Sequence, residues 1–233
     1  MFHAPIRPGP TPRYCRPSHR QRAYEARRKA AQTDGVSSAP FEARSPSGGG
    51  PFIRVLGPIE AFDLHGCPVS LGPSLRRVLA ILAVRPREVV SREAFIDRVW
   101  PDVDDRVASR RLHTAVWKLR LLLAGGDEAE ARRLIRWSAP GYLLDVSDDH
   151  LDWARFRRLR QAGERALREG AHSLARGYLS AALSLWNGPE VLAGVDVSAD
   201  DLGFVAERLA GRERAARNLI QARFELGDQV IPD

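Results

Sequence analysis

The sequence predicts a mostly α-helical fold with small antiparallel β elements, and three observations lead to that prediction. Short segments rich in β-branched and aromatic residues begin at Phe52, three amphipathic segments at helical spacing follow from Ser74, and longer helical segments extend from Trp153 to Leu226. Of the 233 residues, 44% are hydrophobic, which is enough to form a core. A chain of this length holds one large domain or two small ones.

The β elements are predicted in two groups that lie far apart along the chain. Five short segments have the composition of strands: FIRVLG (52–57), IEAFDL (59–64), PVSL (68–71), LIRWS (134–138) and YLLDV (142–146). The first three surround a turn at His65-Gly66 and predict a small antiparallel sheet. The last two flank Ala139-Pro140-Gly141, a sequence typical of turns, and predict a hairpin.

Two helices are predicted between these groups of strands. Residues 74–84 carry apolar side chains at helical spacing and end before Pro86, which disfavours a longer helix. Val89 and Val90 form a short extended link to Ser91, a residue type that caps helices. The helix after Ser91 carries one apolar stripe before Pro101, made of Phe95, Ile96, Val99 and Trp100.

A third helix, from Asp104 to Gly126, has the clearest periodicity. Asp104 or Asp105 is suited to accept hydrogen bonds from the free N–H groups at its start, and Gly125 is a typical stop signal. Its apolar residues recur at the spacing of a single buried stripe: Leu112, Val116, Leu119 and Leu123. We expect this stripe to face a core, because an isolated helix of this kind is only marginally stable.

The opposite face of the third helix is basic. From Asp105 to Leu123 the chain holds five lysine or arginine residues and one acidic residue, and Trp117 lies outside the apolar stripe. In the major groove of DNA, arginine and lysine reach phosphates or guanine edges, and threonine and histidine meet base edges. Seven residues are therefore candidate DNA contacts: Arg110, Arg111, His113, Thr114, Trp117, Lys118 and Arg120. The alternative is an ordinary charged surface, with Trp117 covered by a neighbouring element.

The order of elements, strands followed by three helices and a terminal hairpin, is that of a winged helix-turn-helix. In this architecture the third helix enters the major groove, and the hairpin, or wing, lies along the DNA backbone or in the adjacent minor groove. Arg136 and Ser138 lie on the predicted wing and join the candidate DNA contacts. Taken singly, each also fits an ordinary exposed residue beside a turn.

Several segments resemble a known family. VLG (55–57), LG (71–72), LRRVLAILA, VVSREAFIDRVWPD, RLHTAVWKLRLLL and PGYLLDV are similar to the OmpR-type DNA-binding domain of the Streptomyces antibiotic regulatory protein family, and DHLDWARFRRL and LSLWNGP resemble its bacterial transcriptional activation domain. The resemblance extends from residue 52 to about residue 230. It implies that Arg110 to Arg120 form the recognition helix, that Pro140-Gly141-Tyr142 belong to the wing, and that protomers bind direct repeats near a promoter in tandem.

The C-terminal part also has a helical pattern of its own. Helices are predicted at 153–169, 172–186 and 198–226, and the first two, joined by Gly170, are similar to one tetratricopeptide-type pair. The predicted apolar stripes are Phe156, Leu159, Ala162 and Ala166 in the first helix, and Leu174, Tyr178, Ala181 and Leu185 in the second. Trp186 is assigned to the core. The family's activation domain has several further helices, so we expect either that a second subunit covers the apolar end of this array or that the chain is a shortened member.

The predicted organisation is a disordered basic arm at 1–50, a winged helix-turn-helix domain at 51–147 and a shortened, tetratricopeptide-like helical activation domain at 148–233. The arm holds nine lysine and arginine residues against three acidic residues, and the rest of the chain holds 27 against 26, so most of the formal charge of +7 lies in the arm. Such an arm adds non-specific phosphate affinity. The alternatives are a dispensable extension and a start assigned too far upstream.

No feature of the sequence indicates secretion or a membrane. Cys15 and Cys67 form neither a disulfide framework nor a metal-ligand spacing, and the longest apolar run, Val78 to Val84, is too short to span a bilayer. The first residues are basic but lack the apolar stretch of a signal peptide. We expect a cytoplasmic protein that associates with the nucleoid.

The sequence also lacks common enzyme motifs, so we predict no catalytic activity, no cofactor and no metal. G-x-x-x-x-G-K-S/T, H-E-x-x-H and G-x-S-x-G are absent, and Asp148, Asp149 and His150 are interpreted as a helix-start cluster rather than as an acid and base. The predicted function is a sequence-specific DNA-binding transcriptional activator.

The predicted partners are duplex DNA, a second protomer and RNA polymerase. The alternative function is an adaptor, whose winged domain and helical hairpins dock proteins without specific DNA binding. RNA binding ranks third, because the sequence has neither an RNP-type motif nor a G-X-X-G loop.

Overall fold

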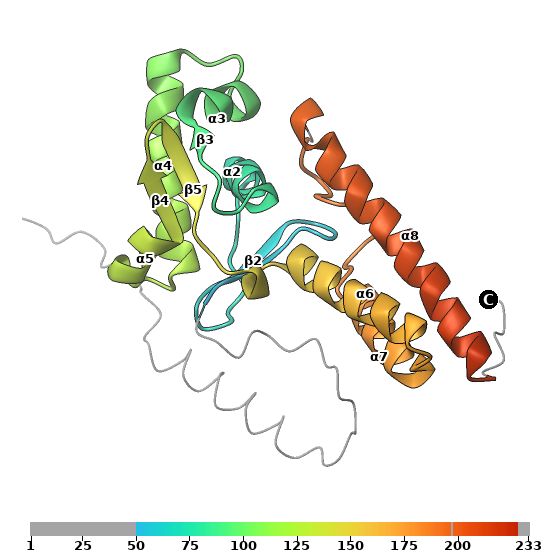
Figure 1. Cartoon of the computed structure of the whole chain (residues 1–233). Coiled ribbons are helices and arrows are strands. Elements are labelled where there is room, and N and C mark those ends of the chain that lie inside the picture. Colours follow the sequence, from blue (N-terminus) through green and yellow to red (C-terminus); the bar gives the residue numbers. More distant parts are fainter. Residues whose placement is uncertain (1–49, 197, 228–233) are drawn as a thin grey trace, which may run out of the picture. The chain divides into compact units, whose positions relative to one another are not determined.

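The computed structural model describes residues 50–196 and 198–227 (Figure 1). The predicted basic arm, apart from Gly50, and Cys15 lie outside the described residues. The chain divides into two units, Met1–Ala39 and Pro40–Asp233, and every described residue belongs to the second. Within that unit the prediction of a mostly helical fold with small antiparallel sheets is confirmed.

The described elements follow one another as two β-strands, a helix–strand–helix–helix–helix segment, a hairpin and a helical C-terminal part. Their bounds are β1 (Phe52–Arg54), β2 (Glu60–Phe62), α2 (Pro73–Val84), β3 (Val90–Ser91), α3 (Arg92–Val99), α4 (Asp105–Leu123), α5 (Glu128–Leu134), β4 (Ile135–Ser138), β5 (Gly141–Leu144), η1 (Asp148–His150), α6 (Asp152–Arg168), α7 (His172–Leu183), η2 (Ala199–Asp201) and α8 (Leu202–Glu225). No helix among these is both long and apolar enough to cross a membrane.

The first sheet is the antiparallel pair of β1 and β2. The turn predicted after β2 is present, because the Asp63 carboxylate accepts hydrogen bonds from the backbone N–H groups of His65 and Cys67. The third strand predicted in this region is reduced to one bridge between Phe62 and Pro68. A proline nitrogen has no hydrogen to donate to a ladder, which limits this strand.

The helices α2, α3 and α4 match the three predicted helices. Ser91 caps α3 as predicted, since its Oγ accepts a hydrogen bond from Ala94 N–H at 3.1 Å. Asp104 is the cap of α4, and its Oδ1 accepts from the N–H groups of Arg106 and Val107. The predicted stripe of α4 is fully confirmed as buried: Leu112, Val116, Leu119 and Leu123.

The second sheet has the strand order β3-β5-β4, with all pairs antiparallel. Strands β4 and β5 form the predicted hairpin, which we call the wing, and it lies beside α4 (Figure 1). Val90 of β3 pairs with Tyr142 of the wing, so the wing is joined to the segment just before α3. The hairpin is thereby held in a fixed place next to the third helix.

Helix α5 was not predicted. Asp127 caps it by accepting hydrogen bonds from the N–H groups of Ala129 and Glu130. Only two of its residues, Ala131 and Leu134, are buried. Two buried positions in seven residues are too few to show a helical period, so the sequence pattern predicts no element over this segment.

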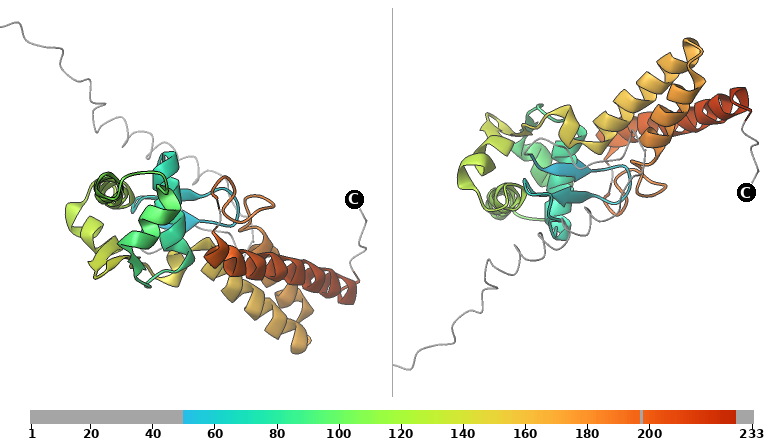
Figure 2. Two further views of the ribbon diagram at one scale, coloured as in Figure 1. Left: turned by 90° about the horizontal axis from the view of Figure 1, so that it is seen from above. Right: turned by 90° about the horizontal axis from the view of Figure 1, so that it is seen from below.

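The C-terminal helices α6, α7 and α8 lie side by side (Figure 1, Figure 2). In α6, Phe156 and Ala166 are buried and Leu159 is partly buried, as predicted. Of the stripe predicted for α7, Ala181 and Leu185 are buried and Tyr178 is partly buried, as predicted. The prediction for Leu174 was wrong, because it is 53% exposed. The buried residues of α7 are Ala175, Leu179, Ala181 and Ala182.

Gly163 of α6 allows the close approach of Leu179 in α7. A Cβ atom at this glycine would lie 2.6 Å from Cγ of Leu179, so the missing side chain makes room for Leu179. Trp186, which follows α7, is partly buried and packs edge-on against Phe156 with the ring centroids 5.6 Å apart. Its predicted place in the core is confirmed.

A buried carboxylate joins α6 to the first sheet. Asp152 Oδ2 accepts hydrogen bonds from the backbone N–H groups of Val55 at 2.8 Å and Leu56 at 2.9 Å, and its Oδ1 accepts from Trp153 N–H. The indole N–H of Trp153 donates to the carbonyl oxygen of Ala83 in α2. The core is therefore continuous across the division predicted near residue 147, and that division stays a prediction.

Asp148 and Asp149 lie at a helix start, as predicted, but neither side chain caps η1 or α6. Asp148 lies in η1, where it accepts hydrogen bonds from Arg87 at 2.7 Å and Arg157 at 3.1 Å, and Asp149 forms an ion pair with Arg158. The Arg87 hydrogen bond holds the pKa of Asp148 below its ordinary value. Both carboxylates serve as partners for arginines, and α6 begins only at Asp152.

Candidate nucleic-acid interface

Helix α4 presents one face to the core and the other to solvent. Leu112 and Leu119 are fully buried, and α4 packs against α2, α3 and α5, so the orientation of the helix is fixed. Six of the seven residues predicted on its outer face are exposed: Arg110, Arg111, His113, Thr114, Trp117 and Lys118. Trp117 is 58% exposed, so no neighbouring described element covers it.

The basic residues of this face have no acidic partner in the described part of the chain. Arg106, Arg110, Arg111 and Lys118, which we call the α4 cations, form no ion pair with any residue in 50–196 or 198–227. Thr114 donates its hydroxyl hydrogen to the carbonyl oxygen of Arg110 at 2.9 Å, so its hydroxyl is left as an acceptor. Unpaired cations on one helix face create a positive field suited to an anionic partner.

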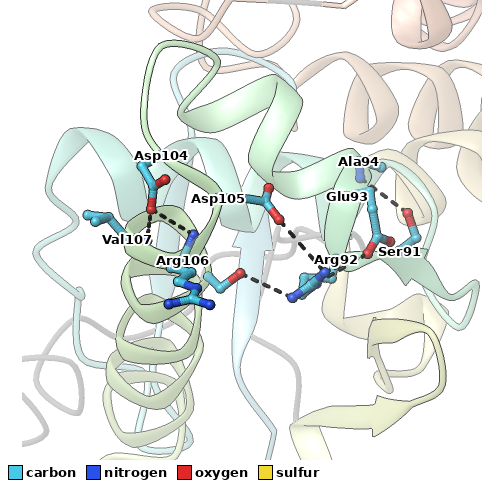
Figure 3. Close-up of polar contacts among 9 residues, drawn as sticks. Ser91, Arg92, Glu93, Ala94, Asp104, Asp105, Arg106 and Val107 are labelled. Carbon is cyan, nitrogen blue, oxygen red and sulfur yellow. Dashed lines mark hydrogen bonds and ion pairs between the residues drawn. The ribbon is translucent and has the colours of Figure 1, made fainter.

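Arg92 connects the starts of α3 and α4 (Figure 3). Its guanidinium donates to Ser109 Oγ at 3.2 Å, contacts the Glu93 carboxylate at 3.1 Å and lies 4.0 Å from Asp105 Oδ2. A backbone hydrogen bond and the Arg92 contact lower the pKa of Glu93. The guanidinium of Arg106 projects beside this group and forms no hydrogen bond or ion pair with the described residues (Figure 3).

Two hollows flank the first turns of α4. The first has a volume of about 440 Å³ and is lined by Arg92, Asp105, Arg106, Ser109 and Arg110. Arg92, Arg106 and Ser109 were not among the interface residues predicted from the sequence. The position of Arg92 directly after a capping serine was the available signal, because such a residue lies at a helix N-terminus, where anions are favoured.

The second hollow has a volume of about 580 Å³ and lies between α4 and the start of α2. Its polar side on α4 consists of Arg110, Arg111, Thr114 and Lys118. On the other side lie the first residues of α2, which has Gly72 as its N-cap and no side-chain cap. Arg110 lines both hollows, so it lies at the centre of the basic face.

Tyr142 joins α4 to the wing. Its buried ring lies 5.0 Å from the ring of Trp137 on β4 and 6.4 Å from that of His113 on α4. The Arg120 guanidinium lies over the same ring at 5.8 Å. Burial raises the pKa of Tyr142, so the phenol stays neutral under ordinary conditions.

Two of the residues predicted to contact DNA, Arg120 and Arg136, have partners within the protein, and a third, Ser138, is partly buried. Arg120 is only partly exposed, donates from Nε to the carbonyl oxygen of Ile135 at 2.7 Å, and has its pKa lowered by burial. Arg136 is exposed and pairs with Asp145 across the wing at 2.8 Å. Ser138 is partly buried at the end of β4. The sequence pattern did not reveal that Arg120 holds the wing on α4.

Two family descriptions match the chain. Residues 66–144 match "Transcriptional regulatory protein, C terminal", and residues 151–231 match "Bacterial transcriptional activator domain". The chain carries both domains of the Streptomyces antibiotic regulatory protein family. The family consists of transcriptional regulators rather than enzymes.

Relatives of known name share parts of this sequence. The chain is 34% identical over 139 residues to transcriptional regulatory protein MoaR1 of Mycobacterium tuberculosis, which covers 59% of this chain and 44% of MoaR1. It is 35% identical over 136 residues to transcriptional regulatory protein EmbR of the same organism, covering 58% of this chain and 34% of EmbR. Regulatory protein DnrI of Streptomyces peucetius is 30% identical over 178 residues, covering 74% of this chain and 63% of DnrI.

A solved structure has the same fold over most of the chain. The structure of Mycobacterium tuberculosis EmbR in complex with a low affinity phosphopeptide superposes with a TM-score of 0.68 at 29% identity, covering 76% of this chain and 46% of that one. The chain thus spans less than half the length of MoaR1 and of EmbR. The winged helix followed by a helical domain is common to this chain and EmbR.

Proposed function

We propose that the chain is a sequence-specific DNA-binding transcriptional activator in which α4 enters the major groove of its operator. One observation carries the proposal: the four α4 cations form no ion pair in the described part of the chain, on a helix whose other face is buried. An arginine or lysine with no partner in the protein is available for phosphates and guanine edges. The family of the chain supports a role in transcription regulation.

The geometry supports a division of roles along α4. Arg110 and Lys118 lie two turns apart on its exposed face and are proposed to reach bases or phosphates, with Arg111 and Thr114 beside them. Arg92 and Arg106 line the hollow at the helix start, where a DNA backbone phosphate fits the positive field. The wing, with Arg136 and Ser138, is proposed to contact the neighbouring backbone.

The helical part is proposed to contact a second protomer or RNA polymerase while the winged part holds the promoter. In this proposal protomers occupy direct repeats in tandem, and the protein acts at the nucleoid in the cytoplasm. The phosphopeptide belongs to the EmbR complex and supports no assignment for this chain. The alternative of an adaptor is less well supported, because the basic face and Trp117 are exposed rather than covered.

A fluorescence anisotropy titration against promoter fragments, with competitor DNA present, tests the proposal. We expect one fragment to bind tightly, with a slope of log affinity against log salt of about −4 to −7, as for four to eight phosphate contacts. Arg110→Ala is expected to weaken binding by roughly 1–3 kcal/mol if it reaches a base. Arg214→Ala removes an exposed arginine of α8 that forms no ion pair among the described residues, and it serves as the matched control. Equal binding to every fragment would refute the proposal.

A further inference from the structure

The exposed side of α4 carries two lines of residues that run along the helix, one basic and one, called the aromatic line, that holds His113 and Trp117. Arg110, Thr114 and Lys118 follow one another at intervals of four residues and line the hollow beside α2. His113, Trp117 and Arg120 follow one another at intervals of four and three residues, which places them along a second line of the same helix. Phosphate binding alone does not account for the exposed indole of Trp117.

The aromatic line faces the wing. Its two ends, His113 and Arg120, both lie against the ring of Tyr142, at 6.4 Å and 5.8 Å. Trp117 lies between them along the helix, so it is on the wing side of α4. Trp137, on β4, packs against the same Tyr142 ring at 5.0 Å. Two tryptophans from different elements therefore border one corner between helix and wing.

Both tryptophans are largely in contact with solvent. Trp117 is 58% exposed and Trp137 is 53% exposed, although Tyr142, on which Trp137 packs, is buried. Large aromatic side chains left in water at one place indicate a surface that is covered in a complex. The α4 cations beside them have no acidic partner in the described residues, so the charge of this surface matches a polyanion. Duplex DNA is the occupant that fits both properties.

We propose that Trp117 makes an apolar contact with the 5-methyl group of thymine in the major groove, and that Trp137 closes the same patch from the wing. The thymine methyl is the only apolar group that a base pair presents in that groove, and apolar side chains distinguish it from cytosine. This inference rests on the proposed DNA binding by α4 and adds a base preference to it. Trp117 then adds a specificity contact for thymine to the contacts proposed for the α4 cations.

Replacing thymine by deoxyuridine tests the inference, because it removes the methyl group and keeps every base-pair hydrogen bond. The site bound by the full chain is first located by footprinting, and then prepared with thymine or with deoxyuridine throughout. We expect deoxyuridine to weaken binding roughly four-fold for each methyl group in contact, the effect of exposing one buried carbon. Trp117→Ala is expected to bind the thymine site more weakly and to lose the preference for thymine.

Two further variants separate the contact from changes in folding. Trp117→Phe keeps an apolar ring and is expected to retain part of the thymine preference, and Trp137→Ala is expected to reduce it. Phe224→Ala, which removes a 75% exposed ring from α8, is expected to leave both affinity and preference unchanged. Equal affinity of the wild-type chain for both duplexes, a footprint without thymine, or an unchanged preference in Trp117→Ala would overturn the inference while DNA binding stands. Absence of any specific fragment would overturn the proposed function as well.

Discussion

The arginines on α4 and the arginines that face the helical part of the molecule have opposite surroundings. Four arginines of the second group meet carboxylates beyond residue 147: Arg77 with Asp196, Arg85 and Arg98 with Asp201, and Arg87 with Asp148. The α4 cations meet no such group in the described residues. A paired cation contributes to folding, whereas an unpaired one is available to a ligand. Substitutions in the first group should therefore change unfolding, and those on α4 should change DNA binding.

Asp152→Ala is expected to have the largest effect on folding. It removes the acceptor of three N–H groups, those of Val55, Leu56 and Trp153. A buried donor left without an acceptor costs about 1–3 kcal/mol, so the free energy of unfolding should fall by roughly 3–5 kcal/mol. Urea unfolding at pH 7.5, followed by tryptophan fluorescence, measures this loss. Asp149→Ala, at an exposed ion pair, should cost no more than about 1 kcal/mol, and an equal loss in both variants would contradict the prediction.

Arg98→Ala should cause the second-largest loss in the free energy of unfolding, because the side chain of its partner Asp201 is only 8% exposed. Removing one member of a buried pair costs about 3–5 kcal/mol, and we expect roughly 2–4 kcal/mol here because Ser198 and Arg85 remain near the carboxylate. Thermal and urea unfolding provide the measurement. Arg77→Ala is the matched control, since its partner Asp196 is 88% exposed and such pairs contribute about 0–1 kcal/mol. Similar losses for Arg77 and Arg98 would show that burial does not decide the contribution.

The pH dependence of stability tests Asp152 in another way. Burial raises its pKa from 3.8 to about 7, although three backbone N–H groups act in the opposite direction. The unfolded chain releases this proton near pH 4 and the folded chain near pH 7, so this carboxyl lowers stability progressively as the pH rises through that window and has no further effect above it. Relative to Asp152→Asn, the wild-type chain should lose roughly 1–2 kcal/mol between about pH 5.5 and 7. If the free energy of unfolding depended on pH in the same way in both proteins, this prediction would be refuted.

The sequence was sufficient to predict α4 because its apolar stripe continues through about three turns and the helix is bounded by a cap and a glycine. The sequence was insufficient for Asp152. This residue is typical of a helix start, but its carboxylate accepts hydrogen bonds from Val55 and Leu56, which lie 97 and 96 positions earlier in the chain. The pairing of the arginines could not be predicted either. The residues around Arg98 and Arg110 do not reveal that Arg98 pairs with Asp201, a carboxylate 103 positions further along the chain. Partners distant in sequence are decided by the packing of α8 and α6, not by local pattern.

Arg120→Ala should have an intermediate effect, because this residue belongs to α4 but has contacts within the protein. It loses the hydrogen bond to the Ile135 carbonyl and the contact with the Tyr142 ring, which together should lower the free energy of unfolding by roughly 1–2 kcal/mol. DNA affinity should fall as well, because the wing is no longer held on α4. Arg132→Ala, at an exposed residue of α5, should change stability by no more than about 0.5 kcal/mol. No difference between the two variants would contradict the role given to Arg120.

Arg110→Ala should have the smallest effect on the free energy of unfolding, and it should raise this quantity rather than lower it. Arg106 and Arg110 are like charges four residues apart on one helix, a pair that costs about 0.2–0.5 kcal/mol, and alanine favours the helix more than arginine does. The free energy of unfolding should therefore stay constant or rise by up to about 0.5 kcal/mol while the affinity for the operator falls. Urea unfolding and anisotropy titrations on one preparation compare the two quantities. A loss of stability with unchanged DNA affinity would place Arg110 with Arg98, among the arginines that hold the fold together.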